Sequence, residues 1–233
     1  METRYKEGIV IVAGGSGCRM NAGLPKQFLP VAGREMLVRT AELFAECLPG
    51  SPLVIVVPQA YAECWERLAA KHSLSGRCIT AYGGASRTQS VRNGLAAMPP
   101  CDIIGIHDGA RPLATPELIR RCFETAREKG SAIPVTEPAD SFRAECDGRL
   151  HPIDRKRLRA VQTPQVFFGD ALRDAYARTE GDFSDDASVM EQAGYGLAFC
   201  EGEPGNIKVT VEADLEYAEY SFAKREGHRT LQP

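Results

Sequence analysis

Residues 8–20 read Gly8-Ile9-Val10-Ile11-Val12-Ala13-Gly14-Gly15-Ser16-Gly17-Cys18-Arg19-Met20. The first half is a short, continuous β-branched run, which is typical of a strand buried on both faces of a parallel sheet. The second half is a glycine-rich turn at the point where that strand ends. Because open parallel sheets bind ligands at the carboxyl ends of their strands, this stretch predicts both an α/β fold and the position of its site.

Strand and helix signals alternate along the rest of the chain. Three more apolar runs predict strands at 52–58, 102–107 and 131–135, and helical patterns lie at 35–47, 59–71, 88–98 and 115–129. A helix at 169–179, a strand near 197–200, a strand-like run at 206–210 and a helix near 212–225 follow. This alternation predicts a Rossmann-like, mostly parallel twisted sheet with helices on both faces.

The segment 136–160 interrupts the alternation. It has no helical pattern, carries several charges and places Asp147-Gly148 at a hairpin turn, so we expect a β-arm that protrudes from the domain. The 233 residues then form a single domain, 1–233, with its arm at about 136–160, because α/β domains commonly reach this length.

The composition excludes several classes of protein. Hydrophobic residues are 43% and charged residues 25%, as in globular proteins, and a net charge of −3 argues against binding nucleic acid through overall charge. No apolar run approaches the ~18 residues of a membrane span. The first residues do not form a signal peptide, so we expect a cytoplasmic protein with no nucleic-acid or membrane partner. The eight cysteines form no Cys-x-x-Cys pair or Cys/His cluster, which predicts free thiols and no structural zinc.

The charge pattern around the glycine-rich turn favours a triphosphate ligand. Residues 8–34 contain no Asp or Glu but contain Arg19, Lys26 and Arg34. Glycines let backbone N–H groups approach anionic oxygens, and cations without acids suit the same ligand. A plain tight turn is the alternative. The turn is neither a dinucleotide fingerprint, which needs a small residue where Met20 lies, nor a Walker A loop, because Lys26 follows a proline.

Three other places carry candidate chemistry. Asp108 follows the third predicted strand, where a carboxylate is well placed to hold Mg²⁺, although a turn aspartate is the simpler interpretation. His107 beside it is more typical of a structural histidine. Four cations within residues 155–159 are typical of a solvated charge run. Lys208 alternates with Ile207 and Val209, which predicts that it faces away from them but assigns no function.

Taken together, the motifs resemble one family. Residues 13–20 with Pro25-Lys26-Gln27 look like the signature loop of sugar-phosphate nucleotidyltransferases. The other motifs are Gly83-Gly84 with Arg87 and Ser90-Val91, His107-Asp108 with Ala110-Arg111-Pro112, Thr163-Pro164-Gln165, residues 184–188 and residues 206–210. From about residue 8 to 225, in order and spacing, the set resembles the 2-C-methyl-D-erythritol 4-phosphate cytidylyltransferase family of non-mevalonate isoprenoid synthesis.

The resemblance implies a reaction and a set of roles. The phosphate of methylerythritol phosphate attacks the α-phosphorus of CTP in line, with Mg²⁺, giving the CDP-alcohol and pyrophosphate. Arg19 and Lys26 stabilise the developing charge, and Arg155 and Lys208 complete the catalytic set. The nucleotide-binding residues implied are Ala13, Gly14, Gly15, Ser16, Gly17, Gly84, Ser90 and Asp108, the last also the metal ligand. The acceptor-binding residues implied are Arg111, Ser141, Thr163, Arg155 and Lys208.

The resemblance also implies a homodimer. In the family the arm crosses to a second subunit and completes its site, so Arg155 is expected to contact the acceptor phosphate in trans. It lies eight residues before Thr163, as in the family, and an arginine can bind phosphate oxygens bidentately. Arg157 and Arg159 compete for the same role.

Four substitutions depart from the family's usual residues, one of them Ser141, which stands where the arm usually has threonine and keeps a hydroxyl. Other functions also compete with the one implied. Gly14 and Gly109 stand where alanine is common, and Ala85 stands where an acidic residue is common, which puts its nucleotide contact in doubt. Ribitol-5-phosphate cytidylyltransferases share the first loop and residues 163–165, whereas Ser90-Val91 and residues 184–188 favour the isoprenoid enzyme. A non-catalytic nucleotide-binding protein is expected to have lost catalytic cations, and none is missing. Met20 counts against a dinucleotide-dependent dehydrogenase.

Overall fold

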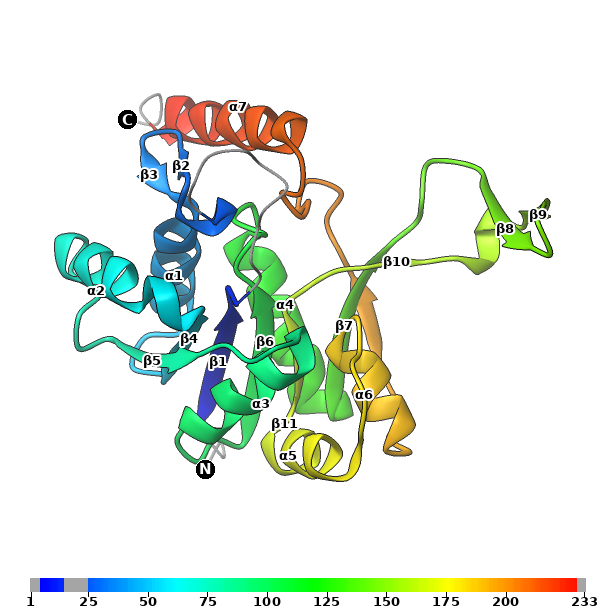
Figure 1. Cartoon of the computed structure of the whole chain (residues 1–233), viewed down its shortest axis with the longest axis horizontal. Coiled ribbons are helices and arrows are strands. Elements are labelled where there is room, and N and C mark those ends of the chain that lie inside the picture. The colour runs from blue at the N-terminus through cyan, green and yellow to red at the C-terminus, as the bar shows by residue number, and fades with distance from the viewer. Residues whose placement is uncertain (1–4, 15–24, 230–233) are drawn as a thin grey trace.

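The computed structural model describes residues 5–14 and 25–229, with side chains as far as residue 225. Its centre is an eight-stranded sheet with the path β10-β7-β11-β6-β1-β4-β5, and β12 pairs with β7 (Figure 1). The strands are β1 (Glu7–Val12), β4 (Leu53–Val57), β5 (Cys78–Tyr82), β6 (Ile103–Asp108), β7 (Ser131–Thr136), β10 (Ala160–Val161), β11 (Gln165–Phe168) and β12 (Phe199–Glu201). The predicted mostly parallel α/β sheet is confirmed.

The parallel part of the sheet aligns four strand ends. β4 and β6 flank β1 in parallel, with Val12 opposite Val56 on one side and Asp108 on the other, and β5 continues the parallel order beyond β4. β11 is antiparallel and lies between β6 and β7. The carboxyl ends of β1, β4, β5 and β6 therefore meet at one edge of the sheet, and the chain enters β11 at the same edge.

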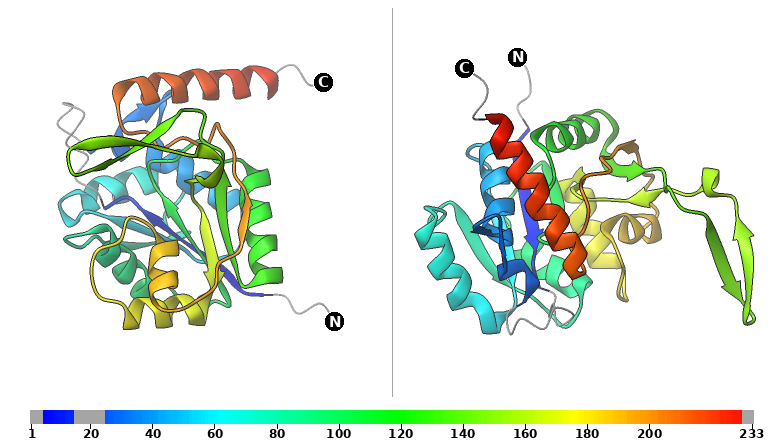
Figure 2. Two further views of the ribbon diagram at one scale, coloured as in Figure 1. Left: turned by 90° about the vertical axis from the view of Figure 1, so that its right-hand side faces the viewer. Right: turned by 90° about the horizontal axis from the view of Figure 1, so that it is seen from above.

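Helices cover both faces of the sheet, as Figure 2 shows. Ile9 and Ile11 pack on one face against α1 (Met36–Cys47), α2 (Ala62–Lys71) and α4 (Pro116–Lys129). Val10 points to the other face and packs among side chains of α3 (Arg87–Ala97), α5 (Gly169–Arg178) and α6 (Asp186–Gln192). The two layers explain why residues 9–12 are all apolar, since successive side chains face opposite layers of helices.

A third, smaller cluster supports the loops at the carboxyl edge. α7 (Glu212–Arg229) lies across the short hairpin of β2 (Pro30–Val31) and β3 (Arg34–Glu35), above the loop that follows β6 (Figure 1). Val31, Met36, Val209 and Ala218 are fully buried in this cluster. The short helices η1 (Lys26–Phe28) and η2 (Gln59–Tyr61) precede β2 and α2. No described helix has the length and hydropathy that a membrane span requires.

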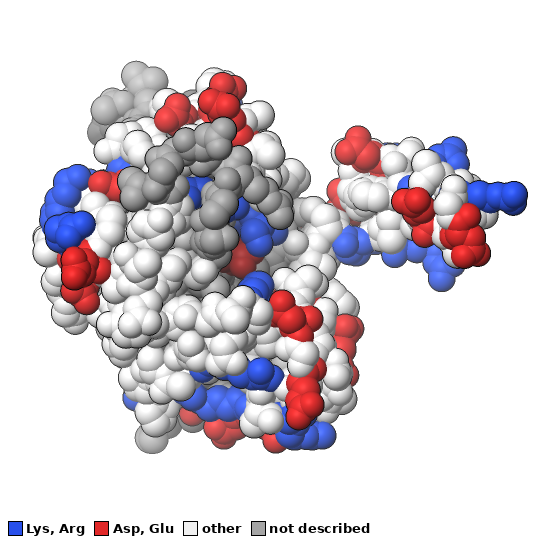
Figure 3. Space-filling view, viewed as in Figure 1, with Lys and Arg blue, Asp and Glu red and all other residues white. Residues whose placement is uncertain are grey.

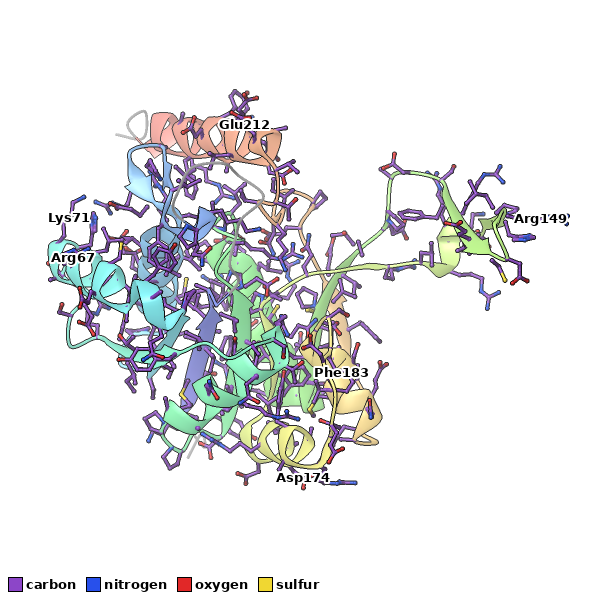
Figure 4. The ribbon with its side chains drawn as sticks, in the orientation of Figure 1. Arg67, Lys71, Arg149, Asp174, Phe183 and Glu212 are labelled. Carbon is purple, nitrogen blue, oxygen red and sulfur yellow. The ribbon has the colours of Figure 1, made fainter. Side chains whose placement is uncertain are left out.

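The segment between β7 and β10 forms a separate hairpin. β8 (Phe142–Cys146) pairs with β9 (Arg149–Ile153) through the expected turn, where Asp147 has φ +50° and Gly148 φ +71°. Two successive residues with positive φ are the requirement of a tight hairpin turn, which Asp-Gly meets at low cost. All ten residues of the two strands are exposed. The hairpin and η3 (Arg155–Arg157) stand away from the body in Figure 1 and in the right-hand view of Figure 2, and Arg149 is labelled on the hairpin in Figure 4.

The structure adds three elements to those predicted, corrects one and agrees with the expectation of free cysteines. β5, β11 and α6 carry no strong periodic pattern and were not predicted from the sequence. Residues 206–210 are not a strand, because their backbone joins no ladder; Val209 N–H donates instead to the Ala110 carbonyl in the loop after β6, at 2.8 Å. The seven described cysteines are free, as expected, and Cys18 lies outside the described residues.

Candidate active site

Five loops converge where the parallel strands end. They follow β1, β5 and β6, precede β11, and run through residues 206–210. On the face drawn in Figure 3, basic side chains gather around an acidic one in a recess. Gly15, Ser16, Gly17 and Arg19 lie outside the described residues. The remaining site residues can be placed individually.

The ends of β1 and β5 and the start of α3 are joined by close backbone packing. A Cβ on Gly14 would lie 2.8 Å from Ser90 Oγ, and a Cβ on Gly83 would lie 3.2 Å from Gly14 Cα. The Ser90 hydroxyl accepts a hydrogen bond from Gly84 N–H at 3.1 Å and donates to the Ser86 carbonyl at 2.8 Å. The end of β1, the turn after β5 and the start of α3 are thus held together, which brings Ala13, Gly14, Gly84 and Ser90 to one place.

Asp108 is surrounded by three cations. Its Oδ2 lies 2.8 Å from Lys208 Nζ and 3.8 Å from Arg111 Nε, and its Oδ1 lies 3.4 Å from Arg87 Nε. Burial alone would raise the pKa of this carboxyl, but the charges of Arg87, Lys208 and Arg111 hold it well below its usual range. The group is therefore a carboxylate at neutral pH, inside a cluster whose net charge is positive.

Arg87 also binds a second, deeper carboxylate. Its Nη1 and Nη2 donate to Asp186 at 3.1 and 2.7 Å, and the Tyr176 hydroxyl donates to the same carboxylate at 2.6 Å. Asp186 is completely buried at the start of α6. The bidentate pair fixes the guanidinium plane, so Asp186 determines how Arg87 faces Asp108.

A neutral histidine orders the loop before β11. Thr163 Oγ1 accepts the Asp108 N–H and lies 3.1 Å from His107 Nδ1, while His107 Nε2 lies 3.0 Å from the Arg111 carbonyl. A carbonyl can only accept, so Nε2 carries the proton and Nδ1 accepts from the threonine hydroxyl. Burial lowers the pKa of His107 to about 4. The expectation of a structural histidine agrees with this geometry, and Thr163 is only 4% exposed.

The lowered pKa of His107 predicts a pH-dependent stability. The unfolded chain takes up a proton near pH 6.5 and the folded one only near pH 4, so stability from this group is complete above pH 6.5 and is lost as pH falls toward 4. Between pH 7 and 4.5 the loss is about 2 kcal/mol. Urea unfolding of the wild type and of His107→Gln at both pH values measures this loss. The free energy of unfolding is expected to fall less in the variant than in the wild type. The exposed His151→Gln is the control, and an equal fall in all three proteins contradicts the assignment.

Two lysines meet at residues 206–210. Lys26 Nζ donates to the Val209 carbonyl at 2.7 Å, and Lys208, two-fifths exposed, reaches Asp108 from the same segment. Arg111 Nη1 donates to the Asn206 carbonyl at 2.8 Å. Contacts between residues up to 183 positions apart in the chain therefore bring Lys26 to the segment whose Lys208 reaches Asp108, and attach Arg111 to the same segment.

The arm residues lie elsewhere. Ser141 and Arg155 are exposed, and Arg155 Nη1 donates to the Ala139 carbonyl at 2.6 Å. Arg159 lies 3.6 Å from the exposed Glu137, and Arg157 is exposed in η3. Because the hairpin stands away from the body, one chain does not bring Ser141 or Arg155 to its own Asp108 (Figure 1).

Asp108 is the carboxylate available for a magnesium ion. Among the described residues no group of three or more His, Cys, Asp or Glu could hold a metal. Mg²⁺ at nucleotide sites is commonly held by one or two carboxylates together with substrate phosphates. A carboxylate has about four lone-pair positions, and Asp108 Oδ1 is engaged only at 3.4 Å. One carboxylate beside a cationic recess fits a metal whose other ligands are phosphate oxygens.

Sequence reasoning gave no role to Arg87, Asp186 or Asn206. Each lies inside a motif that was noted, but their contacts join residues 99, 95 and 43 positions apart. No local pattern records such contacts. The usable signal was the presence of charged or amide side chains within otherwise apolar or small-residue motifs.

The chain is similar to known proteins over most of its length. The family model of 2-C-methyl-D-erythritol 4-phosphate cytidylyltransferase matches residues 8–224. Enzymes of that name from Bacteroides thetaiotaomicron and Bacteroides fragilis are 40% and 39% identical, covering 91% and 90% of this chain and 97% and 96% of their own. The crystal structure of the Thermus thermophilus enzyme of the same name is 33% identical, with a TM-score of 0.76, over 93% of this chain and 98% of its own.

Proposed function

The chain belongs to the 2-C-methyl-D-erythritol 4-phosphate cytidylyltransferase family, and from that premise we propose how its residues perform the reaction. The enzyme joins CTP and methylerythritol phosphate to give the CDP-alcohol and pyrophosphate in isoprenoid precursor synthesis. The observation that supports this function within the molecule is the convergence of Arg87, Arg111 and Lys208 on Asp108 at the carboxyl edge of the sheet, with Lys26 bonded to the segment that carries Lys208.

The protein groups position the reactants and stabilise the negative charge that develops during the reaction. Ala13–Gly17, Gly84 and Ser90 hold the nucleotide, and Arg19 and Lys26 stabilise the charge that grows on the triphosphate as the α-phosphorus is attacked. Arg111, Thr163 and Lys208 hold the acceptor phosphate so that its oxygen lies in line with the leaving pyrophosphate. No covalent intermediate with the protein is needed, because positioning and electrostatics account for catalysis of this type.

Asp108 is proposed to hold Mg²⁺ together with the triphosphate. When bound, the metal neutralises charge on the phosphate oxygens. The three cations around Asp108 keep it ionised at every physiological pH, so the ligand is always available. We place the reaction in the cytoplasm, where CTP is made and where the free thiols of the chain remain reduced.

The arm is proposed to dimerise the protein. Phe142, Leu150 and Ile153 of the hairpin are 42%, 62% and 36% exposed, and a two-stranded hairpin is marginally stable in isolation. A second copy of the chain that covers these side chains supplies the missing contacts. Ser141 and Arg155 of each copy then lie at the acceptor site of the other. Arg155 is the proposed phosphate ligand in trans.

Mixing two inactive variants tests the shared site. Arg155→Ala and Lys26→Ala subunits are expected to recover up to about a quarter of wild-type activity, because random exchange makes half of the dimers mixed and each mixed dimer has one intact site. Turnover after confirmed exchange measures it, and Arg149→Ala at the hairpin serves as the arm control. If confirmed mixed dimers recover no activity, the proposed shared site is wrong.

The acceptor is tested by pyrophosphate release from CTP and Mg²⁺. We expect release with methylerythritol phosphate and none with ribitol 5-phosphate. Release with ribitol 5-phosphate alone keeps the fold and mechanism but replaces the substrate. Release with neither, from folded protein that binds CTP, contradicts the proposed function and leaves a nucleotide-binding protein.

A further inference from the structure

Asn206 is a buried residue that contacts two of the acceptor residues from a third loop. Its Nδ2 donates to the Thr163 carbonyl at 2.9 Å, and its main-chain carbonyl accepts from Arg111 Nη1 at 2.8 Å. It is completely buried. Lys208 follows two residues later and reaches Asp108. The three groups that hold the acceptor phosphate in the proposed function therefore share this neighbour.

The segment that carries Lys208 needs such an anchor. Residues 206–210 belong to no helix or strand, so no ladder fixes their backbone. Within the described part of the chain, the backbone of Asn206 donates to the Glu203 carbonyl at 2.9 Å and that of Val209 to the Ala110 carbonyl at 2.8 Å. Lys208 is held between these two backbone attachments. Loss of the Asn206 side chain weakens the attachment at residue 206.

We propose that Asn206 is a positioning residue that sets Arg111, Thr163 and Lys208 at the spacing an acceptor phosphate requires. The inference rests on the proposed function and deepens it. An amide suits the position because its NH₂ can donate to a main-chain carbonyl without adding charge beside Arg111. Among the described residues its Oδ1 has no hydrogen-bond partner although it is buried, and such an atom is rare in a protein interior. The side chain is thus kept for its donor and not for a fully paired structural network.

Hydrogen exchange tests the anchor without reference to turnover. In Asn206→Ala the amide of Val209 and its neighbours is expected to exchange about tenfold faster or more, because the segment loses its upstream attachment. Asn206→Asp keeps the side-chain volume but cannot donate to the Thr163 carbonyl. The same amides are therefore expected to exchange faster in it, as in Asn206→Ala. The matched control is Ser131→Ala. The buried Ser131 hydroxyl accepts a hydrogen bond from the Ala198 N–H at 2.8 Å, elsewhere on the sheet, and alanine removes that acceptor. The melting temperature of this control should fall comparably while residues 206–210 stay protected.

Kinetics of the same variants test the consequence. The KM for the acceptor is expected to rise about 10- to 100-fold with CTP affinity unchanged, because misplaced phosphate ligands weaken binding of one substrate alone. Unchanged exchange of residues 206–210, or an acceptor KM that rises equally in Ser131→Ala, overturns the proposal. Wild-type protein that releases no pyrophosphate contradicts the proposed function instead, and the exchange measurement then still decides the role of Asn206.

Discussion

Lys26→Ala is expected to lower kcat about 10²- to 10³-fold while changing CTP affinity much less. The reason is that the ammonium meets charge that grows on the triphosphate in the transition state, and loss of one such donor costs about 3 kcal/mol. Steady-state turnover at saturating substrates and a separate titration with CTP measure the two quantities.

The Lys26 side chain has a second contact that the experiment must separate from its charge. Its Nζ donates to the Val209 carbonyl, so alanine also removes a tether of the Lys208 segment. Lys26→Gln keeps a donor but no charge, and is expected to remain as slow as the alanine variant. Arg34→Ala is the matched control, because Arg34 comes from the same cation-rich stretch but forms a half-exposed pair with Glu42 at 2.8 Å. Near-normal turnover of Lys26→Gln would show that the tether, and not the charge, is what matters.

Asp186→Ala is expected to lower the free energy of unfolding by about 3–5 kcal/mol. Removing one partner of a buried ion pair leaves the other charge uncompensated, and that is the costly outcome. Here Arg87 loses two hydrogen bonds and its side chain is only 18% exposed. Denaturant unfolding at neutral pH measures the change.

Two further variants show whether the charge is responsible. Tyr176→Phe removes only the hydroxyl that donates to Asp186 and is expected to cost about 1 kcal/mol. Arg67→Ala, on the outer side of α2 (Figure 4), breaks a surface ion pair and is expected to leave stability unchanged. Combining Asp186→Ala with Arg87→Met is expected to cost less than the sum of the single changes, because the second removes the stranded charge. If the stability costs of the two changes are simply additive, the energetic coupling between Arg87 and Asp186 is contradicted.

The periodic elements were predictable from the sequence alone. The apolar runs of β1, β4 and β6 and the helices between them match within one to three residues, because burial on a sheet or helix repeats every two or 3.6 residues. The hairpin turn at Asp147-Gly148 was predictable for an equally local reason, since positive φ values restrict the residues that fit. The position of Asp108 at the carboxyl edge of the sheet was predictable because strand ends in a parallel sheet share one edge.

The arrangement around Asp108 was decided only by the tertiary structure. The insertion of β11 between β6 and β7, the pairing of Arg87 with Asp186, and the bond from Asn206 to Thr163 all join residues far apart in the chain. Residues 206–210 show the difference: their alternating pattern is that of a strand, but their backbone bonds go to two loops. A sequence pattern reports which residues are buried. Which partners they meet depends on how distant segments pack, and packing has no period along the chain.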